Sequence, residues 1–271
     1  MLSWIDGQNA EVLSARDRGL AYGDGLFETI RVSAGRPRLL ARHRARLEEG
    51  VRRLSLPVSL DLVEDEILRF STLLGDGVAK LVLTRGEGVR GYAPQADAQV
   101  RRLLLASPAP AYPAKNWEEG VRLFSCATRL AEQPLLAGLK HLNRLEQVLA
   151  RAEWSDPAFA EGLMRDVSGR VVEGVFSNLF LVKHGELITA DLGRCGVAGV
   201  MRAEIIERAR SLGLPVIVRD IEHGELADAD EVFLCNSLYG IWPVLGVAEF
   251  TWPVGPLTRK LQGQLRELLD S

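Results

Sequence analysis

The sequence predicts an α+β protein of two domains. Short strand-like runs alternate with helical patterns in the first third of the chain, a proline-rich segment follows, and the remainder is richer in strand-like runs. The chain has 271 residues, of which 47% are hydrophobic and 25% are charged. This is an ordinary globular composition, with enough length for one large or two modest domains.

The first domain is predicted over residues 1–110 as a small α+β unit. Apolar residues at helical spacing indicate its helices, and short apolar runs between turn residues indicate its strands. In chain order, the predicted elements are a turn at Asp6-Gly7, a strand at 27–32, a turn at Ala34-Gly35, helices at 41–54 and 60–74, and buried strands at 80–84 and 103–107 joined by a glycine-rich loop at 85–92.

A proline-rich segment separates the two predicted domains. Three prolines stand in the six positions from Pro108 to Pro113. Because proline lacks a backbone N–H and clashes within a helix, residues 108–115 are expected to form neither a helix nor a central strand. The boundary is therefore placed after residue 110.

The second domain is predicted over residues 111–271 and is the larger one. Its elements follow from the same patterns. They are a strand at 121–127, a helix from 142 to about 154, strand pairs turning at Ser168-Gly169 and His184-Gly185, a helix from 200 to 212, strands at 216–218 and 231–234, and a final helix at 257–269.

Charge and composition exclude several classes of partner. The net charge is -3 and the pI is near 5.9, which gives no basic surface for nucleic acid or an anionic membrane. No run of about 18 apolar residues predicts a membrane span. The three cysteines match no zinc or disulfide pattern, and the four histidines are scattered, so a metal site is not expected. A cytoplasmic protein with a small-molecule ligand is predicted.

Lysine is scarce enough that a reactive lysine can be sought by elimination. Three of the five lysines lie where an ammonium group stays solvated, namely Lys115, Lys183 and Lys260. Of the other two, Lys80 and Lys140, the latter follows the apolar run 135–139, where desolvation would favour a neutral, nucleophilic amine. Taken without further information, Lys140 fits better as an ordinary lysine at a helix start.

Four segments resemble known enzymes. Residues 138–151, GLKHLNRLEQVLAR, are similar to the cofactor-lysine segment of aminodeoxychorismate lyases. Residues 22–29, 43–47 and 173–180 resemble the wider group of fold type IV pyridoxal-phosphate enzymes, which includes D-amino-acid and branched-chain aminotransferases. The resemblance covers essentially the whole chain. It implies a small N-terminal α/β sandwich domain and a larger, cofactor-binding C-terminal domain with a pseudo-barrel of strands surrounded by helices.

The resemblance also implies a role for individual residues. Lys140 corresponds to the lysine that carries pyridoxal 5'-phosphate and serves as the catalytic base. The other cofactor-binding residues that it implies are Arg46 and Ser237 for the phosphate, the backbone amides of Val200 and Met201 at a helix N-terminus, Glu173 for the pyridine nitrogen, and Asn178 beside Glu173. Without the resemblance, Arg46 would be interpreted as a solvated helix arginine, and Glu173 equally well as a surface glutamate.

Candidates for substrate binding are less specific. Arg90 and Tyr92, in the glycine-rich loop, are expected to reach a substrate carboxylate, and Asn236 is a further candidate. Glu28 and Thr29 are possible pocket residues. The loop lacks the Gly-Lys-Ser/Thr ending of a nucleotide-binding loop, so its glycines could equally serve tight turns.

The activity implied is β-elimination from 4-amino-4-deoxychorismate, giving 4-aminobenzoate and pyruvate in folate biosynthesis, by a homodimer. An aminotransferase acting on D-amino or branched-chain amino acids shares the cofactor-binding residues and is the first alternative. A non-catalytic binding protein with the same fold is the second, and it would be colourless after purification.

Overall fold

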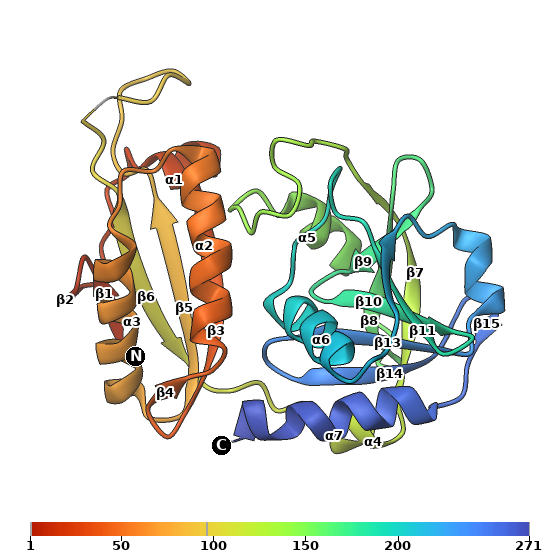
Figure 1. The fold of residues 1–271 in the computed structure, drawn as a ribbon. Coiled ribbons are helices and arrows are strands. Elements are labelled where there is room, and N and C mark those ends of the chain that lie inside the picture. The colour runs from red at the N-terminus through yellow and green to blue at the C-terminus, as the bar shows by residue number, and fades with distance from the viewer. Residues whose placement is uncertain (1, 96, 271) are drawn as a thin grey trace. The chain divides into compact units, whose positions relative to one another are not determined.

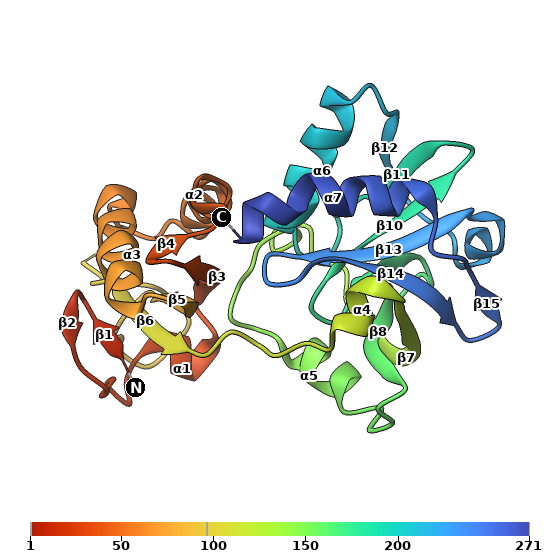
Figure 2. The same cartoon turned by 90° about the horizontal axis from the view of Figure 1, so that it is seen from below.

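The computed structural model describes residues 2–95 and 97–270. The chain divides into two units, whose helices and strands are labelled in Figure 1 and again in the turned view of Figure 2. Among the described residues, the first unit contains those up to Pro110 together with Leu139–Asn143, and the second contains Ala111–Gly138 and Arg144–Asp270. The boundary predicted after residue 110 did not anticipate that Leu139–Asn143 would group with the first unit.

An antiparallel six-stranded sheet forms one layer of the first unit. The strand order is β2-β1-β6-β5-β3-β4. The strands are β1 (Ser3–Ile5), β2 (Gln8–Asn9), β3 (Gly25–Ser33), β4 (Arg36–Pro37), β5 (Gly77–Thr84) and β6 (Arg101–Ser107). The predicted strands of this part are confirmed, and so are the turns, where Asp6, Gly7, Ala34 and Gly35 all have positive φ.

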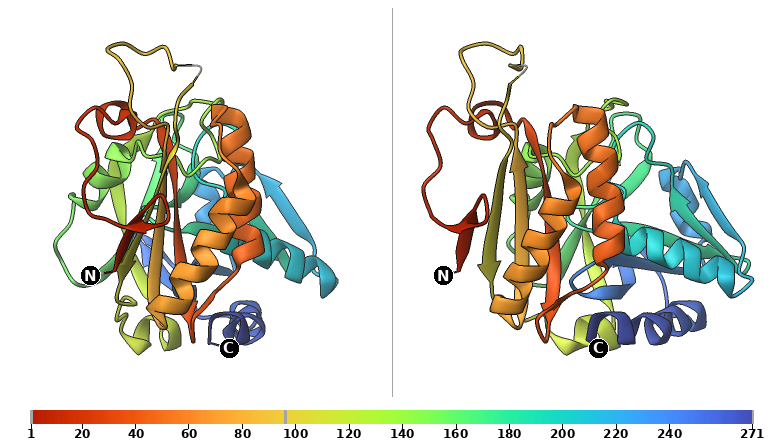
Figure 3. Two further views of the ribbon diagram at one scale, coloured as in Figure 1. Left: turned by 90° about the vertical axis from the view of Figure 1, so that its left-hand side faces the viewer. Right: turned by 60° about the vertical axis from the view of Figure 1, so that its left-hand side comes forward.

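Two helices form the second layer of this unit. Helices α2 (Leu40–Leu54) and α3 (Leu60–Leu74) cover one face of the sheet, as Figure 3 shows, and match the two predicted helices. Their apolar faces bury Leu47, Ile67 and Phe70 against the sheet. The unit is thus the predicted α/β sandwich. The short helix α1 (Arg18–Tyr22), which was not predicted, begins where the Asp17 side chain accepts hydrogen bonds from backbone amides.

The alternation of side chains along β3 brings a carboxylate into this core. Leu26, Ile30 and Val32 lie on the buried face of the strand. Because successive side chains of a strand point to opposite faces, Glu28 lies on that face too.

A closed ring of strands forms the centre of the second unit. Strands β10, β13, β14, β7, β8 and β9 pair in that order, and β9 pairs again with β10, so the predicted pseudo-barrel is confirmed. The strands of the unit are β7 (Val121–Leu130), β8 (Phe159–Asp166), β9 (Val171–Gly174), β10 (Asn178–Lys183), β11 (Glu186–Ala190), β12 (Val216–Arg219), β13 (Glu231–Asn236), β14 (Gly240–Val247) and β15 (Phe250–Thr251).

Helices pack around this ring. They are α4 (Ala114–Glu118), α5 (Leu145–Arg151), α6 (Val200–Ser211), the 3-10 helix η1 (His223–Asp228) and α7 (Pro256–Asp270). Residues 108–115 were expected to contain no helix, which was wrong for the last two of them. Pro113 is the N-cap of α4, and the helix begins at Ala114. Strand β14, which contains Pro243, was missed. No helix among the described residues is long and apolar enough to cross a membrane.

The helix predicted from residue 142 to about 154 is shorter than expected. The backbone of Leu139–Asn143 instead pairs with the start of β3: the Phe27 N–H donates to the Lys140 carbonyl at 2.9 Å, and the Leu142 N–H donates to the Gly25 carbonyl at 3.1 Å. Because this pairing keeps residues 140–142 out of helical hydrogen bonding, α5 begins only at Leu145.

Candidate active site

A buried ionic cluster lies between β3 and α2 in the first unit. The Glu28 Oε2 atom is 2.6 Å from His43 Nδ1, and the Arg46 Nε–H donates to Glu28 Oε1 at 2.8 Å. Arg46 also forms an ion pair with Glu28 through Nη2. The predicted phosphate ligand Arg46 is therefore held in place by a carboxylate from the neighbouring strand.

The partners of Glu28 favour its ionised form despite its burial. Burial opposes ionisation of Glu28, but the charges and hydrogen bonds of Arg46 and His43 outweigh it and lower the pKa of Glu28 to about 2. Burial also lowers the pKa of His43, and the positive charges of Arg46 and Lys140 act in the same direction, against the opposite effect of Glu28. Lys140 therefore lies within electrostatic reach of this cluster.

Lys140 extends from the segment that pairs with β3. Its Nζ atom lies 4.2 Å from the centroid of the Phe27 ring, and its neighbour Leu139 is buried in the core of the unit. An amine over an aromatic face, next to a packed core, is partly removed from water. Lys80, the other lysine left by elimination, has an exposed side chain with Nζ 5.6 Å from the same ring.

In the second unit, Glu173 and Asn178 face each other across β9 and β10. They are register partners, and the Asn178 Nδ2 atom donates to Glu173 Oε2 at 3.4 Å. The backbone N–H of Val197 donates to the same oxygen at 2.8 Å, and Asn178 Nδ2 donates to the Val197 carbonyl at 2.9 Å. The buried Glu173 carboxylate is thus fixed by an amide side chain and by the loop before α6.

Sequence reasoning missed a basic neighbour of Glu173. Burial lowers the pKa of Arg144, and the negative charge of Glu173 offsets part of this effect. The two side chains therefore interact electrostatically within the second unit. No sequence pattern indicated this pair, because the residues are 29 positions apart, as their numbers show.

Val200 and Met201 begin α6, as predicted. The helix N-cap is Gly199, which provides no side-chain hydrogen bond to the first-turn amides. A Cβ atom at Gly199 would lie 2.0 Å from Asn178 Oδ1. The close approach of Asn178 thus requires glycine here and joins the start of α6 to the Glu173 pair.

The loop leading to Lys140 is attached to the loop leading to α6. The Gly138 N–H donates to the Gly196 carbonyl at 2.9 Å, and the Ala198 N–H donates to the Gly138 carbonyl at 2.9 Å. Gly138 precedes Lys140 by two positions. The backbone on the N-terminal side of the lysine is therefore held by the same loop that contacts Glu173.

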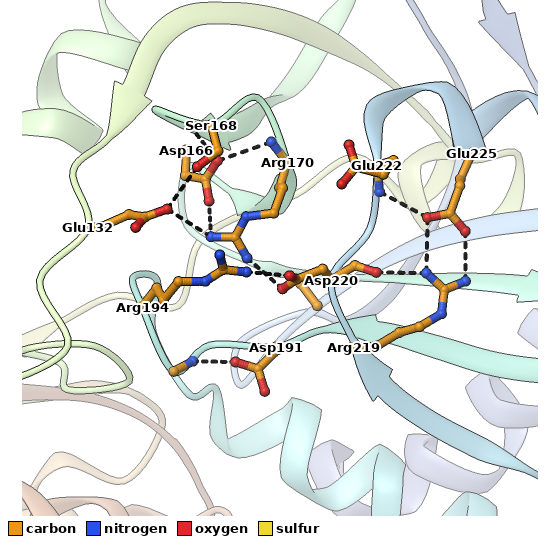
Figure 4. Close-up of polar contacts among 12 residues, drawn as sticks. Glu132, Asp166, Ser168, Arg170, Asp191, Arg194, Arg219, Asp220, Glu222 and Glu225 are labelled. Carbon is orange, nitrogen blue, oxygen red and sulfur yellow. Dashed lines mark hydrogen bonds and ion pairs between the residues drawn. The ribbon is translucent and has the colours of Figure 1, made fainter.

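An ion-pair network centred on Arg170 supports these two loops (Figure 4). The buried guanidinium of Arg170 contacts Asp220 at 2.5 Å and Glu132 at 3.1 Å, and it also forms an ion pair with Asp166. Arg194 pairs with Asp220, so the loop of Arg194 and the loop of Glu132 share this network. Buried carboxylates need such partners, since an unpaired charge removed from water is strongly destabilising.

A second buried carboxylate, Glu161, supports the turn between β9 and β10. Its Oε1 atom accepts a hydrogen bond from the Val175 N–H at 2.9 Å, and its Oε2 atom accepts one from Ser177 Oγ at 2.7 Å. Burial raises the pKa of Glu161 to about 8, although these hydrogen bonds act to lower it. The Ser177 hydroxyl thus helps to hold the Glu161 carboxylate beneath this turn.

The remaining predicted residues lie at the edges of each unit. Ser237 follows β13, two positions after Cys235, the register partner of Asn178. The Asn236 Oδ1 atom accepts hydrogen bonds from the backbone amides of Leu238 and Tyr239. Asparagine side chains commonly stabilise turns in this way. Arg90 and Tyr92 lie in an exposed loop of the first unit.

The structure thus brings the predicted residues into two groups. Lys140 lies beside the Glu28 cluster that contains Arg46, and Glu173, Asn178 and the start of α6 are joined by hydrogen bonds. Asn236 and Ser237 lie one strand away from Asn178. Of the supporting residues, Glu28 was named from the sequence as a possible pocket residue and lies on the buried face of β3, whereas no sequence pattern indicated Arg170 or Glu161.

Comparisons with known proteins agree on the type of protein. A solved structure, described as a 4-amino-4-deoxychorismate lyase from Pseudomonas aeruginosa, has 67% sequence identity and a TM-score of 0.98, with all of both chains covered. The aminodeoxychorismate lyase of Vibrio harveyi is 38% identical over 97% of this chain and 98% of its own. A putative branched-chain-amino-acid aminotransferase of Methanocaldococcus jannaschii is 32% identical over 98% of this chain and 93% of its own.

The family assignment rests on most of the chain. Residues 25–247, from the first residue of β3 to the last of β14, match the family described as amino-transferase class IV. This range includes Lys140, Arg46 and Glu173. The chain belongs to the class IV aminotransferase family.

Proposed function

We propose that the protein is a pyridoxal-phosphate-dependent 4-amino-4-deoxychorismate lyase that releases 4-aminobenzoate and pyruvate. The full-length similarity to two lyases supports this reaction over transamination. The single structural observation that supports the cofactor most strongly is the buried Glu173 carboxylate, held by Asn178 and by the Val197 amide in the loop before α6.

The residues fit the cofactor. Glu173 is a buried carboxylate able to keep a pyridine nitrogen protonated, and the start of α6 presents the amides of Val200 and Met201 without a side-chain cap. Gly199 keeps that start clear of a side chain. We assign the phosphate to Arg46, Ser237 and these amides, the pyridine nitrogen to Glu173 with Asn178 in support, and the aldehyde carbon to Lys140.

When bound, pyridoxal phosphate supplies an electron sink for the carbon that bears the substrate amino group. The chain's own residues then move the protons. The amine of Lys140 takes the proton from that ring carbon as general base. The C–O bond to the enolpyruvyl group breaks, the electron pair leaves with the oxygen, and protonation gives pyruvate while the ring becomes aromatic.

The structural elements explain how Lys140 is oriented for this role. Its backbone is paired with β3 through Phe27, and its Nζ atom lies over the Phe27 ring. Two anchors on the chain, at Gly138 and at Phe27, restrict the lysine to a small range of positions. Such restriction favours a proton transfer that needs one alignment of base and C–H bond.

Further assignments rest on the resemblance. We assign most of the cofactor contacts to residues 111–271. We assign substrate binding to Arg90, Tyr92 and Asn236. The whole chain is proposed to act as a homodimer in the cytoplasm, as part of folate biosynthesis. The three buried cysteines are free thiols, which is usual in a reducing compartment. Sedimentation equilibrium of the loaded enzyme tests the dimer, and a monomer would contradict it.

The activity is tested by product stoichiometry. The purified protein, loaded with pyridoxal phosphate, is given 4-amino-4-deoxychorismate, and both products are measured over time. Equal amounts of 4-aminobenzoate and pyruvate are expected. Absence of both products, together with conversion of D-alanine or a branched-chain amino acid in the presence of 2-oxoglutarate, would show an aminotransferase instead. A protein that takes up no cofactor would contradict both.

A further inference from the structure

Arg18 uses its guanidinium to hold the glycine-rich loop of the first unit. The residue begins α1 and is only 5% exposed. Its Nη1 atom donates to the Gly91 carbonyl at 3.0 Å and its Nη2 atom donates to the Tyr92 carbonyl at 2.7 Å. Its Nε atom donates to Asp24 Oδ2 at 2.9 Å. One planar group therefore connects the loop to the partly buried carboxylate of Asp24.

That carboxylate is itself anchored to the core of the unit. Asp24 Oδ2 also accepts a hydrogen bond from Arg85 Nε at 2.8 Å, and Arg85 donates to the carbonyls of Leu54 and Ser55 at the end of α2. Burial opposes ionisation of Asp24, but the two arginines outweigh it and lower its pKa. Arg18 is thus fixed at one end to a rigid element.

Backbone hydrogen bonds also join the loop to the segment around Arg18: the Arg18 N–H donates to the Gly86 carbonyl at 2.8 Å, and the Gly88 N–H donates to the Arg16 carbonyl at 3.3 Å. Val89 and Tyr92 are 64% and 85% exposed, so their side chains contribute little packing. The Tyr22 ring lies 5.5 Å from the Tyr92 ring and 5.0 Å from the Arg18 guanidinium. The contacts that define the loop near Tyr92 therefore converge on Arg18 and its neighbour in α1.

We propose that Arg18 is a positioning residue for the substrate: it fixes the loop so that Arg90 and Tyr92 are presented to the substrate carboxylates. This inference rests on the function proposed above, because it needs a substrate that Arg90 and Tyr92 bind. Arg18 itself has its donors directed to two carbonyls and one carboxylate, so it acts through the loop. A lysine cannot replace it, since an ammonium group lacks the planar arrangement of donors.

The test compares KM with kcat in two variants that disturb the same contact. Arg18→Lys keeps the charge beside Asp24 but loses the fork. Gly88→Ala changes the loop side of the same contact, because it places a Cβ atom 2.8 Å from Arg18 Cδ. Both should raise KM for 4-amino-4-deoxychorismate on the order of tenfold, with kcat and the cofactor absorbance changed little. Arg16→Gln, at an exposed neighbour in sequence, is the matched control and should leave both constants unchanged.

A variant cycle separates positioning from a general loss of structure. Because Arg18 acts through Arg90 and Tyr92, adding Arg18→Lys to a protein that carries both Arg90→Gln and Tyr92→Phe should raise KM little further. Fully additive effects, or an unchanged KM in folded Arg18→Lys and Gly88→Ala proteins, would overturn the proposal.

Hydrogen exchange distinguishes this inference from the proposed function. Exchange of the amides of residues 86–94 should be faster in both variants than in the unaltered protein, while exchange in β5 stays the same. If the unaltered enzyme made no 4-aminobenzoate, the proposed function would fail even though the loop result held. Unchanged loop exchange in both variants would refute the role of Arg18 whatever the activity.

Discussion

The Glu28 carboxylate and the His43 imidazole form a pair in which both side chains are almost fully buried and Oε2 lies 2.6 Å from Nδ1. Arg46 completes the group with an ion pair to the same carboxylate. The positive charge of Lys140 also lowers the pKa of His43. The buried pair therefore interacts with two residues proposed to bind the cofactor, Arg46 and Lys140.

Replacing Glu28 should destabilise the protein and change its response to acid. Glu28→Gln leaves Arg46 without its buried partner, which should lower the free energy of unfolding by roughly 3 kcal/mol at pH 7. The folded-state pKa of Glu28, about 2, lies below its usual 4.5. Its contribution is therefore fully present above pH 4.5 and is lost as the pH falls toward 2. Urea unfolding between pH 7 and pH 3 measures both effects.

The control for this prediction is Glu48→Gln, at an exposed position of α2, the helix that contains His43 and Arg46. It should be neutral at pH 7. If the Glu28→Gln protein lost stability with acid as steeply as the unaltered protein, the assignment of a depressed Glu28 pKa would be wrong.

Glu161 should affect stability in the opposite pH direction. Its folded-state pKa, about 8, lies above the usual 4.5, so the folded protein holds a proton that the unfolded chain releases. Stability should therefore decrease as the pH rises from 4.5 to 8. Glu161→Gln keeps a neutral acceptor for Val175 and should make this decrease smaller. Thermal unfolding at pH 5 and pH 8 tests it, and an identical pH dependence in both proteins would count against the prediction.

Removing the Arg170 guanidinium should loosen the loop that leads to Lys140. Arg170→Gln leaves Glu132, Asp166 and Asp220 without their shared cation and should cost about 3 kcal/mol of unfolding free energy. Hydrogen exchange over residues 131–138 should become faster. Arg210→Gln, at an exposed position of α6, is the control and should alter neither quantity. Unaltered exchange in Arg170→Gln would show that the network does not hold the loop.

Two glycine substitutions should have opposite effects. Gly199→Ala places a Cβ atom 2.0 Å from Asn178 Oδ1, so it should destabilise the protein by about 1–3 kcal/mol and weaken cofactor uptake. Gly263→Ala lies within α7, where a Cβ atom meets nothing within 4 Å, and should stabilise the protein by up to about 1 kcal/mol. Thermal unfolding with and without pyridoxal phosphate measures both. Equal tolerance of the two substitutions would contradict the proposed packing around Asn178.

Local patterns were sufficient to predict most of the individual elements. Helix α3 was predicted with both of its ends from its apolar residues at helical spacing, and the structure shows Ser59 capping its start and Gly75 following its last residue. The barrel hairpins at Ser168-Gly169 and His184-Gly185 were found from their turn residues. These features depend on residues close together in sequence, which is why they are visible without a structure.

Long-range contacts account for what was missed. The helix was predicted to begin at residue 142, but the backbone pairing of Lys140 and Leu142 with β3 keeps this segment out of α5. Strand β14 was overlooked because Pro243 is unusual in a central strand. The polar side chains that support the site, such as Arg170 and Glu161, are recognised only by partners brought to them by the fold.

The central claim is that Lys140 is the catalytic lysine of a 4-amino-4-deoxychorismate lyase, and two lysine variants test it most directly. Lys80 and Lys140 both lie near the Phe27 ring, with Nζ at 5.6 and 4.2 Å from its centroid. The measurement is the rate of 4-aminobenzoate formation by Lys140→Ala and Lys80→Ala proteins loaded with pyridoxal phosphate. The account predicts that Lys140→Ala loses at least about 10³-fold in rate while Lys80→Ala stays within about twofold of the unaltered enzyme. Substantial activity in Lys140→Ala would contradict it.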